Sequence, residues 1–225
     1  GGNNTGIKRA QRRGSNYMLL LNNDTTVASD FLDVLVRAVE SDRTIGIAGP
    51  KIYDHAEPKR VWFPGATFSF RDGGNHFMDD GNDVRDTSFM TGCALLIKRE
   101  TIEKIGFMPE EYFLYYEDID WSLSARKAGY RVIVVPAAHV WHKVSRSTSQ
   151  LGDPTRHYYH VRNALLLTSR RAPFFTKIGV HAWSVWHYLK QIIKLALFPL
   201  KREISRAIMR GIDDFWKGKL GRFLP

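Results

Sequence analysis

Between Asn16 and Pro136 the chain alternates short, continuous apolar runs with longer segments whose apolar residues recur at helical spacing. The continuous runs lie at residues 17–21, 45–48, 93–97 and 131–135. A strand gives a continuous apolar run when both faces of its sheet are covered. Strands of this kind separated by helices are typical of an α/β domain, in which we expect a mostly parallel sheet.

Helices are predicted between some of these strands. Residues 31–39 place apolar side chains at helical spacing, and Ser29 is positioned to cap that helix. A second helix is predicted at residues 119–128 and is closed by Gly129. Residues 53–88 are rich in glycine, aspartate and asparagine, which predicts a long irregular segment, and we expect substrate contacts there.

The C-terminal region differs, because residues 173–222 combine apolar and basic stripes on predicted helices. The first apolar stripe comprises Ile178, Ala182, Val185, Trp186, Leu189, Ile193 and Leu197. The second comprises Ile204, Ile208, Ile212 and Phe215. Aromatic side chains accompany both stripes, as in helices that lie on membrane surfaces. Packing of both helices on the α/β domain explains the same pattern, and the pattern alone does not separate the two interpretations.

Charge is distributed unevenly along the chain. The formal net charge is +10, but residues 1–140 hold 17 basic and 19 acidic side chains, whereas residues 141–225 hold 16 and 4. Such a basic region suits nucleic acid, anionic lipid or a phosphorylated substrate. Because its aromatic residues join the apolar stripes instead of alternating with basic residues, we favour a membrane surface and expect no nucleic-acid partner.

Composition excludes several classes of protein. A hydrophobic fraction of 44% with 25% charged residues is that of a globular domain, not of a disordered chain, a collagen or a coiled coil. Cys93 is the single cysteine, which excludes internal disulfides and multi-cysteine metal sites. No charge-free run reaches 18 residues and the first 13 residues lack an apolar core, so neither a spanning helix nor a secretion signal is expected.

Polar side chains follow the first predicted strand. Asn22, Asn23 and Asp24 lie where that strand ends, and open α/β sheets bind ligands beyond the carboxyl ends of their strands. A carboxylate at this point is suited to a divalent metal that neutralises a diphosphate. The alternative is an ordinary turn in which these side chains bond their own backbone.

Two further clusters are candidates for chemistry. Glu117, Asp118 and Asp120 lie at the start of a predicted helix, where a carboxylate serves as a cap or, with its pKa raised by the crowding of like charges, as a general base. His139 and His142 flank Trp141 beyond the last predicted strand, as metal ligands or as packed side chains. These clusters therefore offer a base and a second metal ligand.

Taken together, these motifs resemble the family 2 glycosyltransferases, and most closely the bacterial rhamnosyltransferases. The resemblance rests on short motifs in the family's order: Gly-Gly-Asn-Asn at 1–4, Leu-Leu-Leu-Asn-Asn-Asp at 19–24, Thr-Gly-Cys-Ala at 91–94, Tyr-Tyr-Glu-Asp-Ile-Asp-Trp at 115–121, Val-Trp-His at 140–142 and His-Val-Arg-Asn at 160–163. Each motif is weak alone, but their order along one chain makes the signal specific.

The resemblance implies a fold and a set of site residues. The fold is GT-A, a Rossmann-like α/β domain, here at residues 1–168, followed by a basic amphipathic helical region at residues 169–225. The cofactor is Mg²⁺ or Mn²⁺, held by Asp24 with His142. Asp118 is the general base, within a catalytic cluster that includes Glu117 and Asp120. The remaining expected contacts are Asn22, Asn23, Asp24, Gly92, Arg146 and Arg162 to the donor, and Trp121 to the acceptor.

Two departures from the family pattern affect these expectations. The family's metal motif often reads Asp-x-Asp, whereas Asn22 occupies the first position here, so Asp24 is expected to act without a second carboxylate. The family's chains also begin with strand–helix units that bind the nucleoside, so we expect the 225 residues to be a fragment of a parent protein that has about 60 more residues of this kind before Gly1. We therefore expect the 225 residues alone to bind nucleoside diphosphate weakly and to turn over little donor.

The resemblance leads to a functional hypothesis. We expect an inverting glycosyltransferase that moves a hexose, rhamnose from dTDP-rhamnose, to a glycan or lipid-linked acceptor in bacterial cell-envelope polysaccharide synthesis. It is expected to be cytoplasmic and peripheral on the inner face of the plasma membrane. One alternative is a catalytically incomplete fragment with a structural or membrane-binding role. Another is a metal-dependent nucleotidyltransferase. That class usually has a glycine-rich basic loop near its start, and residues Gly1–Arg13 have a similar composition.

Overall fold

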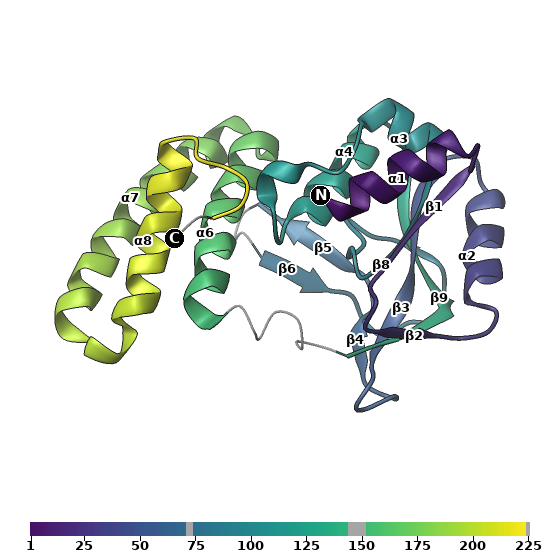
Figure 1. The fold of residues 1–225 in the computed structure, drawn as a ribbon, viewed down its shortest axis with the longest axis horizontal. Coiled ribbons are helices and arrows are strands. Elements are labelled where there is room, and N and C mark those ends of the chain that lie inside the picture. Colours follow the sequence, from purple (N-terminus) through teal and green to yellow (C-terminus); the bar gives the residue numbers. More distant parts are fainter. Residues whose placement is uncertain (71–73, 144–151, 224–225) are drawn as a thin grey trace. The chain divides into compact units, whose positions relative to one another are not determined.

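The structure is a computed structural model that describes residues 1–70, 74–143 and 152–223. The chain divides into two compact units (Figure 1). The first contains the sheets and nearly all of the first four helices, and the second contains Glu110–Glu117 and the C-terminal helices. This division differs from the expected boundary after residue 168, because the long helix α6 (Gly152–Arg171) packs with the helices that follow it.

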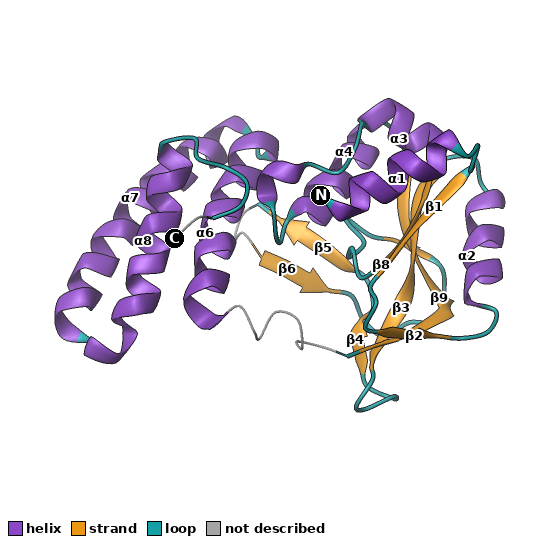
Figure 2. Cartoon of the chain, viewed as in Figure 1, coloured by secondary structure: helices purple, strands orange, loops and turns teal. Residues whose placement is uncertain are grey.

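The first unit is an α/β domain (Figure 2). Its strands and helices are α1 (Gly2–Arg12), β1 (Tyr17–Leu21), β2 (Thr25–Val27), α2 (Phe31–Glu40), β3 (Ile45–Asp54), β4 (Val61–Phe63), β5 (Ala66–Ser69), β6 (Gly74–Phe77), β7 (Arg85–Asp86), β8 (Ala94–Lys98), α3 (Arg99–Ile105), α4 (Glu117–Lys127) and β9 (Arg131–His142). The main sheet has the order β1-β8-β3-β9-β2, with β4 beside β3 and β7 beside β9. The α/β class and the positions of the predicted strands are therefore confirmed.

The expectation of a mostly parallel sheet is wrong. Among the described strands only β3 and β9 pair in parallel, and β1–β8, β8–β3, β2–β9, β3–β4 and β7–β9 are antiparallel. The physical reason is that a continuous apolar run reports burial of both faces of a strand and carries no information on its direction. β8 is buried along its whole length, whereas β1, at the edge, alternates between buried and partly exposed residues.

Three local predictions also differ from the structure. Residues 53–88 are not irregular throughout, because they contain β4 and β7 and a hairpin in which Ala66 pairs with Phe77. Ser29 does not cap α2, since Asp30 precedes its first residue and no side-chain cap bond forms there. Gly129 does follow α4 as expected, with a φ of 93° that favours glycine.

The N-terminal residues form α1, which the sequence did not indicate. The Asn4 side chain fixes this helix by pairing with the backbone of Met108, donating to its carbonyl oxygen (2.8 Å) and accepting from its amide (3.1 Å). Ile7 is buried on the same helix. The loop that a nucleotidyltransferase would need at Gly1–Arg13 is thus replaced by a helix, which removes the feature that favoured that alternative.

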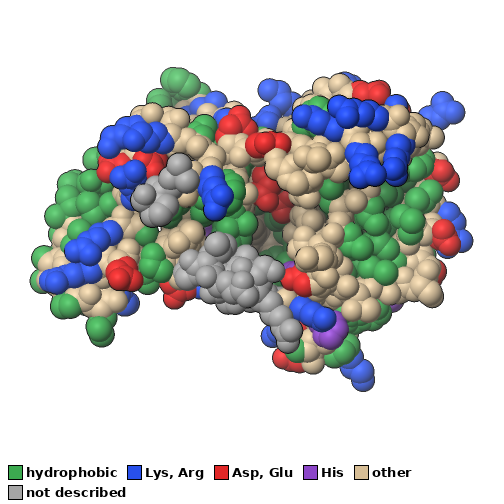
Figure 3. All heavy atoms as spheres, in the orientation of Figure 1, with side chains coloured by type: hydrophobic (Ala, Val, Ile, Leu, Met, Phe, Trp, Pro, Cys, Tyr) green, Lys and Arg blue, Asp and Glu red, His purple; other side chains and the backbone are tan. Residues whose placement is uncertain are grey.

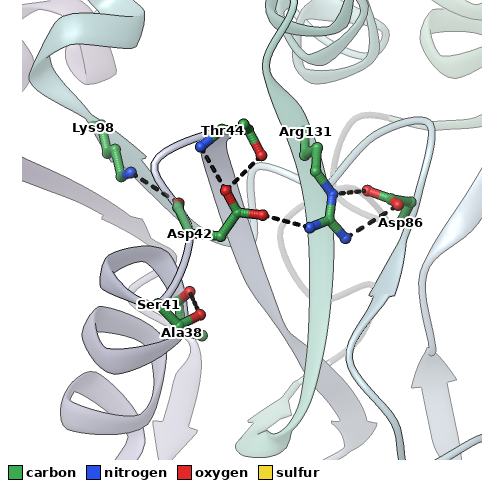
Figure 4. A network of polar contacts seen from close by, with 7 residues as sticks. All are labelled: Ala38, Ser41, Asp42, Thr44, Asp86, Lys98 and Arg131. Carbon is green, nitrogen blue, oxygen red and sulfur yellow. Dashed lines mark hydrogen bonds and ion pairs between the residues drawn. The ribbon is translucent and has the colours of Figure 1, made fainter.

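Arg131, the first residue of β9, is the centre of a network of polar contacts at one end of the main sheet (Figure 4). Arg131 donates to Asp42 (2.8 Å) and, through two nitrogens, to Asp86 of β7 (2.9 and 3.2 Å). Thr44 donates to Asp42 from its amide and its hydroxyl, and these bonds, together with Arg131, lower the pKa of the Asp42 carboxyl. The network ties β7 and the turn before β3 to β9.

The second unit consists of α6, α7 (Phe174–Leu197) and α8 (Arg202–Trp216), with the segment 110–117. Its apolar core comprises Leu165, Ile208 and Ile212, with Val161, Val180, Tyr188, Ile204 and Phe215 packed against it. The second predicted stripe is therefore the buried face of α8. No helix among the described residues is both long enough and apolar enough to cross a membrane.

The α6–α8 contact yields a prediction for stability. A Cβ added at Gly211 would lie 2.8 Å from the backbone oxygen of Tyr158, so Gly211→Ala should destabilise the folded protein by about 1–3 kcal/mol. Gly179 in α7 is the matched control, because a Cβ there meets nothing within 4 Å. Gly179→Ala should stabilise by roughly 0.5–1 kcal/mol through helix propensity. Urea unfolding measures both, and equal shifts in the same direction would contradict the close α6–α8 approach.

Candidate active site

The turn after β1 lies beside the start of β8 because these strands are antiparallel. The Asn22 amide donates to the Cys93 carbonyl (2.9 Å), and the Thr25 hydroxyl donates to the Asn22 carbonyl (2.7 Å). The side chains of Asn22 and Asn23 are exposed, which leaves their amide groups accessible to a ligand. Residues 22–24 therefore form a turn, as one interpretation predicted, and this turn also lies at the carboxyl end of β1, as the other predicted.

Asp24 and His142 meet across two paired strands. β2 pairs with β9 so that Thr25, next to Asp24, lies opposite His142. His142 Nε2 lies 3.2 Å from Asp24 Oδ1, and the Lys143 amide donates to the Asp24 carbonyl (3.0 Å). The His142 side chain is largely buried and its ring contacts Trp62 at 4.9 Å between centroids. The two expected metal ligands, separated by more than a hundred residues, are adjacent in the folded chain.

The other members of the third cluster are packed side chains. Trp141 stacks on Tyr53 with ring centroids 6.0 Å apart and donates its indole N–H to the Pro58 carbonyl (3.2 Å). His139 contacts the Tyr53 ring edge-on, at 5.4 Å. Packing therefore accounts for His139 and Trp141, and His142 alone of the three faces Asp24.

Asp118 is held by backbone amides at the start of α4. Its Oδ2 accepts from the Gly92 amide (2.9 Å) and its Oδ1 from the Ile119 amide (2.8 Å). Burial raises the pKa of the Asp118 carboxyl, and the two amide bonds lower it by less. A buried carboxylate with a raised pKa, held in place by amides, has the properties of a general base.

The cause of that shift differs from the sequence-based expectation. Crowding with Glu117 and Asp120 was expected to raise the Asp118 pKa, whereas burial is the main cause. Glu117 and Asp120 lie one and two positions from Asp118, and side chains at these spacings do not face each other on a helix. Asp120 is buried in the first unit, and Glu117 is grouped with the second.

Cys93 connects the two halves of the candidate site. Burial raises the pKa of its thiol to about 12, and Asp24 and Asp118 both add to this shift electrostatically. Hydrogen bonds place both halves beside this residue, because the Gly92 amide donates to Asp118 and the Asn22 amide, two residues before Asp24, donates to the Cys93 carbonyl. Sequence reasoning quoted Cys93 within a motif but assigned it no place in the site.

Two predicted contacts, Trp121 and Arg162, fall elsewhere. Trp121 is 1% exposed and donates its indole N–H to the Gly106 carbonyl (2.9 Å), a core position that leaves no surface for an acceptor. Arg162 is also 1% exposed, and its guanidinium donates to backbone carbonyls of the second unit, including those of Tyr112 and Gly221. Arg146 lies outside the described residues.

The Asp24–His142 pair fits a divalent ion that is shared with a substrate. No group of three or more His, Cys, Asp or Glu side chains suited to a metal occurs among the described residues. Mg²⁺ and its analogues commonly take one or two protein ligands and complete their coordination with water and substrate phosphates. The atoms that face each other are His142 Nε2 and Asp24 Oδ1, and a nitrogen and a carboxylate oxygen at this separation can bind one ion together.

Residues 17–206 match the family model described as "Glycosyl transferase family group 2". The chain belongs to this family. The match covers most of the chain and includes every element of the candidate site, from the end of β1 to the end of β9. The family resemblance expected from the motifs is confirmed.

Rhamnosyltransferases occur among the relatives of this glycosyltransferase chain. It is 24% identical over 194 residues to the dTDP-rhamnosyl transferase RfbF of Shigella flexneri, covering 82% of this chain and 64% of RfbF. It is 32% identical over 90 residues to the N-acetylglucosaminyl-diphospho-decaprenol L-rhamnosyltransferase of Mycobacterium tuberculosis, covering 39% and 29%. The chain spans less than two thirds of the length of either relative.

A solved structure shares the fold. The structure of GalNAc-T7 with UDP, GalNAc and Mn²⁺ aligns with 94% of this chain and 43% of its own, with a TM-score of 0.53 and 15% identity. The likeness establishes the GT-A fold that the motifs implied. The fold brings the end of β1, the start of β8, the end of β9 and the start of α4 to the candidate site described above.

Proposed function

We propose that this family member is an inverting glycosyltransferase that moves a hexose from a nucleotide-diphosphate sugar to a glycan or lipid-linked acceptor. The observation that carries the proposal is that hydrogen bonds bring the buried Asp118 carboxylate to Gly92 and the turn that bears Asp24, the partner of His142, to the adjacent Cys93. A ligand for a diphosphate-bound metal and a base with a raised pKa are the two parts that a single displacement at a sugar carbon needs.

Asp118 is the proposed base. Its carboxylate takes the proton of the acceptor hydroxyl as that oxygen forms a bond to the anomeric carbon. The bond from this carbon to the diphosphate oxygen breaks, and the pair of electrons leaves with the diphosphate, so the configuration inverts. The amides of Gly92 and Ile119 keep the carboxylate in one orientation. Glu117 and Asp120, its neighbours on α4, are the residues to test beside it.

Asp24 and His142 are the proposed ligands of Mg²⁺ or Mn²⁺. Such an ion supplies charge that stabilises a departing diphosphate. Within the chain, Asp24 would contribute a hard carboxylate oxygen and His142 an imidazole nitrogen from the same side, as their 3.2 Å separation allows. Asn22, Asn23 and Gly92 border the carboxylates and are the proposed neutral contacts to the donor.

Rhamnose is the proposed sugar and dTDP-rhamnose the proposed donor. The support is the similarity to RfbF, named as a dTDP-rhamnosyl transferase, and to the mycobacterial L-rhamnosyltransferase. The latter's name specifies an N-acetylglucosaminyl-diphospho-decaprenol acceptor, which supports a lipid-linked glycan acceptor in cell-envelope polysaccharide synthesis. Such an acceptor would be reached at the inner face of the plasma membrane.

The exposed face of α7 supports peripheral binding to an anionic membrane. The first apolar stripe is not buried in the structure, because its large side chains are about half exposed or more: Ile178, Val185, Trp186, Leu189, Ile193 and Leu197. Figure 3 shows hydrophobic side chains gathering over the α7 side of the second unit, with Lys and Arg side chains beside them. Lys190 lies over the Trp186 ring at 4.9 Å. Aromatic and basic groups adjoining an apolar face suit the interfacial region of a bilayer.

Vesicle co-sedimentation tests this surface. The double variant Trp186→Ser/Leu189→Ser should bind anionic vesicles at least about tenfold more weakly, since each side chain contributes on the order of 1.5 kcal/mol or more when buried. Added salt should weaken wild-type binding. The control Leu32→Ser/Val84→Ser removes side chains of similar exposure from the first unit and should bind normally. Equal binding by both double variants would show that α7 does not contact the lipid.

The proposed activity is tested with the full-length protein. Calorimetry should detect dTDP-rhamnose binding that strengthens with Mn²⁺, and NMR of the product should show an anomeric configuration opposite to that of the donor. Retention of configuration would exclude the single displacement, and binding indifferent to Mn²⁺ would exclude the metal assignment.

A further inference from the structure

The segment that leads into α4 has an unusual backbone. Residues 110–117 are grouped with the C-terminal helices, and Asp118 follows directly. Phe113, Tyr115 and Tyr116 have φ angles of 63°, 66° and 73°. Side chains with a Cβ rarely adopt this left-handed region, and such strain persists only where the surroundings hold it.

Asn163 of α6 contributes hydrogen bonds that keep the segment in this conformation. Its side chain is fully buried, and Nδ2 donates to three carbonyl oxygens of the segment, those of Tyr112 (3.0 Å), Leu114 (2.7 Å) and Tyr115 (3.0 Å). Its Oδ1 accepts from Arg162 Nε (2.9 Å), which fixes the amide with its NH₂ group toward the segment. One side chain thus holds the carbonyls on both sides of Phe113.

Arg162 extends the same contact. Its Nη2 donates to the carbonyls of Tyr112 (2.8 Å) and Glu111 (3.3 Å), and its Nη1 donates to that of Gly221 (2.7 Å). The planar guanidinium offers several donors in a fixed arrangement, so it can bind carbonyls from two segments at once. The Arg162 guanidinium, which was expected to contact a diphosphate, instead donates hydrogen bonds to backbone carbonyl oxygens.

Ring contacts with α6 complete the arrangement. Phe113 stacks on Tyr159 with centroids 5.4 Å apart, and Tyr115 stacks on His160 at 4.3 Å. Two of the left-handed residues therefore place their rings on the helix whose Asn163 binds their carbonyl region. Four residues of α6 therefore hold the segment, Tyr159 and His160 by ring contacts and Arg162 and Asn163 by hydrogen bonds.

We propose that Arg162 and Asn163 are positioning residues for the transfer reaction, which fix the strained segment 110–117 and so the path by which the chain enters α4 at Asp118. The inference rests on the proposed base function of Asp118. Neither side chain is required to touch a substrate. Their effect reaches the base through the backbone, because Glu117 and Asp118 are the first two residues of α4.

Asn163→Asp is the decisive variant. It keeps the shape and the oxygen that accepts from Arg162, but it turns a carboxylate oxygen toward three carbonyl oxygens. We expect kcat to fall by roughly a hundredfold, the effect of a misplaced catalytic group, while donor affinity stays at the wild-type level. Hydrogen exchange of the amides in residues 110–120 should become faster in the same variant.

Ser184→Ala is the matched control. Ser184 is fully buried in the second unit and accepts from the Trp216 indole (3.2 Å), but none of its hydrogen bonds reaches residues 110–117. This variant should lose stability and keep kcat. If it loses as much kcat as Asn163→Asp, the effect comes from general destabilisation of the helices and the inference is wrong.

Arg162→Lys supplies a second variant should Asn163→Asp not fold. It keeps the positive charge and the three Asn163 bonds but loses the forked donors. A smaller fall in kcat with unchanged donor KM supports positioning, whereas a rise in donor KM alone means that Arg162 contacts the diphosphate. If the wild type transfers no sugar, the proposed function fails; unchanged exchange in residues 110–120 of Asn163→Asp overturns the inference whatever the activity.

Discussion

Asp118→Asn should lower kcat by about a hundredfold to ten-thousandfold while donor and metal affinity stay close to wild type. The amide has the same shape as the carboxyl and still accepts a backbone hydrogen bond, from Gly92 or Ile119. It cannot take the proton of the acceptor hydroxyl. Steady-state kinetics of the full-length protein, with calorimetry of donor binding, measures both quantities.

The neighbouring carboxylates decide whether the base is assigned correctly. Glu117→Gln and Asp120→Asn should reduce kcat far less than Asp118→Asn, since only Asp118 combines burial with bonds from Gly92 and Ile119. Loss of turnover in one of them, with normal turnover in Asp118→Asn, would move the base to that residue. Normal turnover in all three would contradict the inverting mechanism.

The raised pKa of Asp118 has opposite consequences for activity and for stability. Because the base acts as the carboxylate, kcat/KM should fall as pH drops through this raised pKa, at a higher pH than for an ordinary aspartate. The folded protein binds this proton more tightly than the unfolded chain does. The group therefore stabilises the fold below its ordinary pKa of 3.8, and this contribution is lost as pH rises through the raised value. The Tm difference between wild type and Asp118→Asn, followed over this range, should show that slope.

The sequence predicts strand positions better than strand directions. The apolar run of β8 is long enough to show that the strand is buried on both faces, but the same residues would fit either direction. The sequence did not indicate α1, because its main anchors are two hydrogen bonds from Asn4 to the backbone of Met108, a residue 104 positions away. Such a contact leaves no periodic signal.

The candidate site could be predicted where it depends on strand ends. Asp24 and His142 were both expected beyond strand ends, and the family resemblance assigned them to one ion, whereas the β2–β9 pairing that brings them together was not predicted. Trp121 and Arg162 belong to motifs of the same family pattern, but a motif does not say whether a side chain faces solvent or the core. The structure buries both and gives each a backbone carbonyl as a partner.

The left-handed residues before Asp118 had no sequence signal either. Left-handed backbone is usually marked by glycine, whereas Phe113, Tyr115 and Tyr116 are aromatic. Their conformation depends on Asn163, about fifty residues later, so local propensity does not indicate it. The part of the site that long-range hydrogen bonds create is the part that sequence reasoning missed.

Asp24→Asn should weaken Mn²⁺ binding and donor binding together, by roughly tenfold to a hundredfold each. The amide keeps the size of the side chain beside His142 but removes the negative charge that a divalent ion requires. His142→Ala should weaken both to a lesser degree, because it removes one neutral ligand and leaves the carboxylate. Calorimetry with Mn²⁺ in the presence of dTDP reads binding without any turnover.

Asp30→Asn is the control for this last pair of variants. Asp30 precedes α2 in the same unit, and its side chain is exposed and makes no cap bond, so its loss removes the same charge from the surface. Mn²⁺ affinity should be unchanged in it. If Asp24→Asn and Asp30→Asn behave alike, the Asp24–His142 pair is a packed ion pair and the diphosphate is stabilised by other groups. If donor binding falls in Asp24→Asn with Mn²⁺ affinity intact, Asp24 contacts the donor directly.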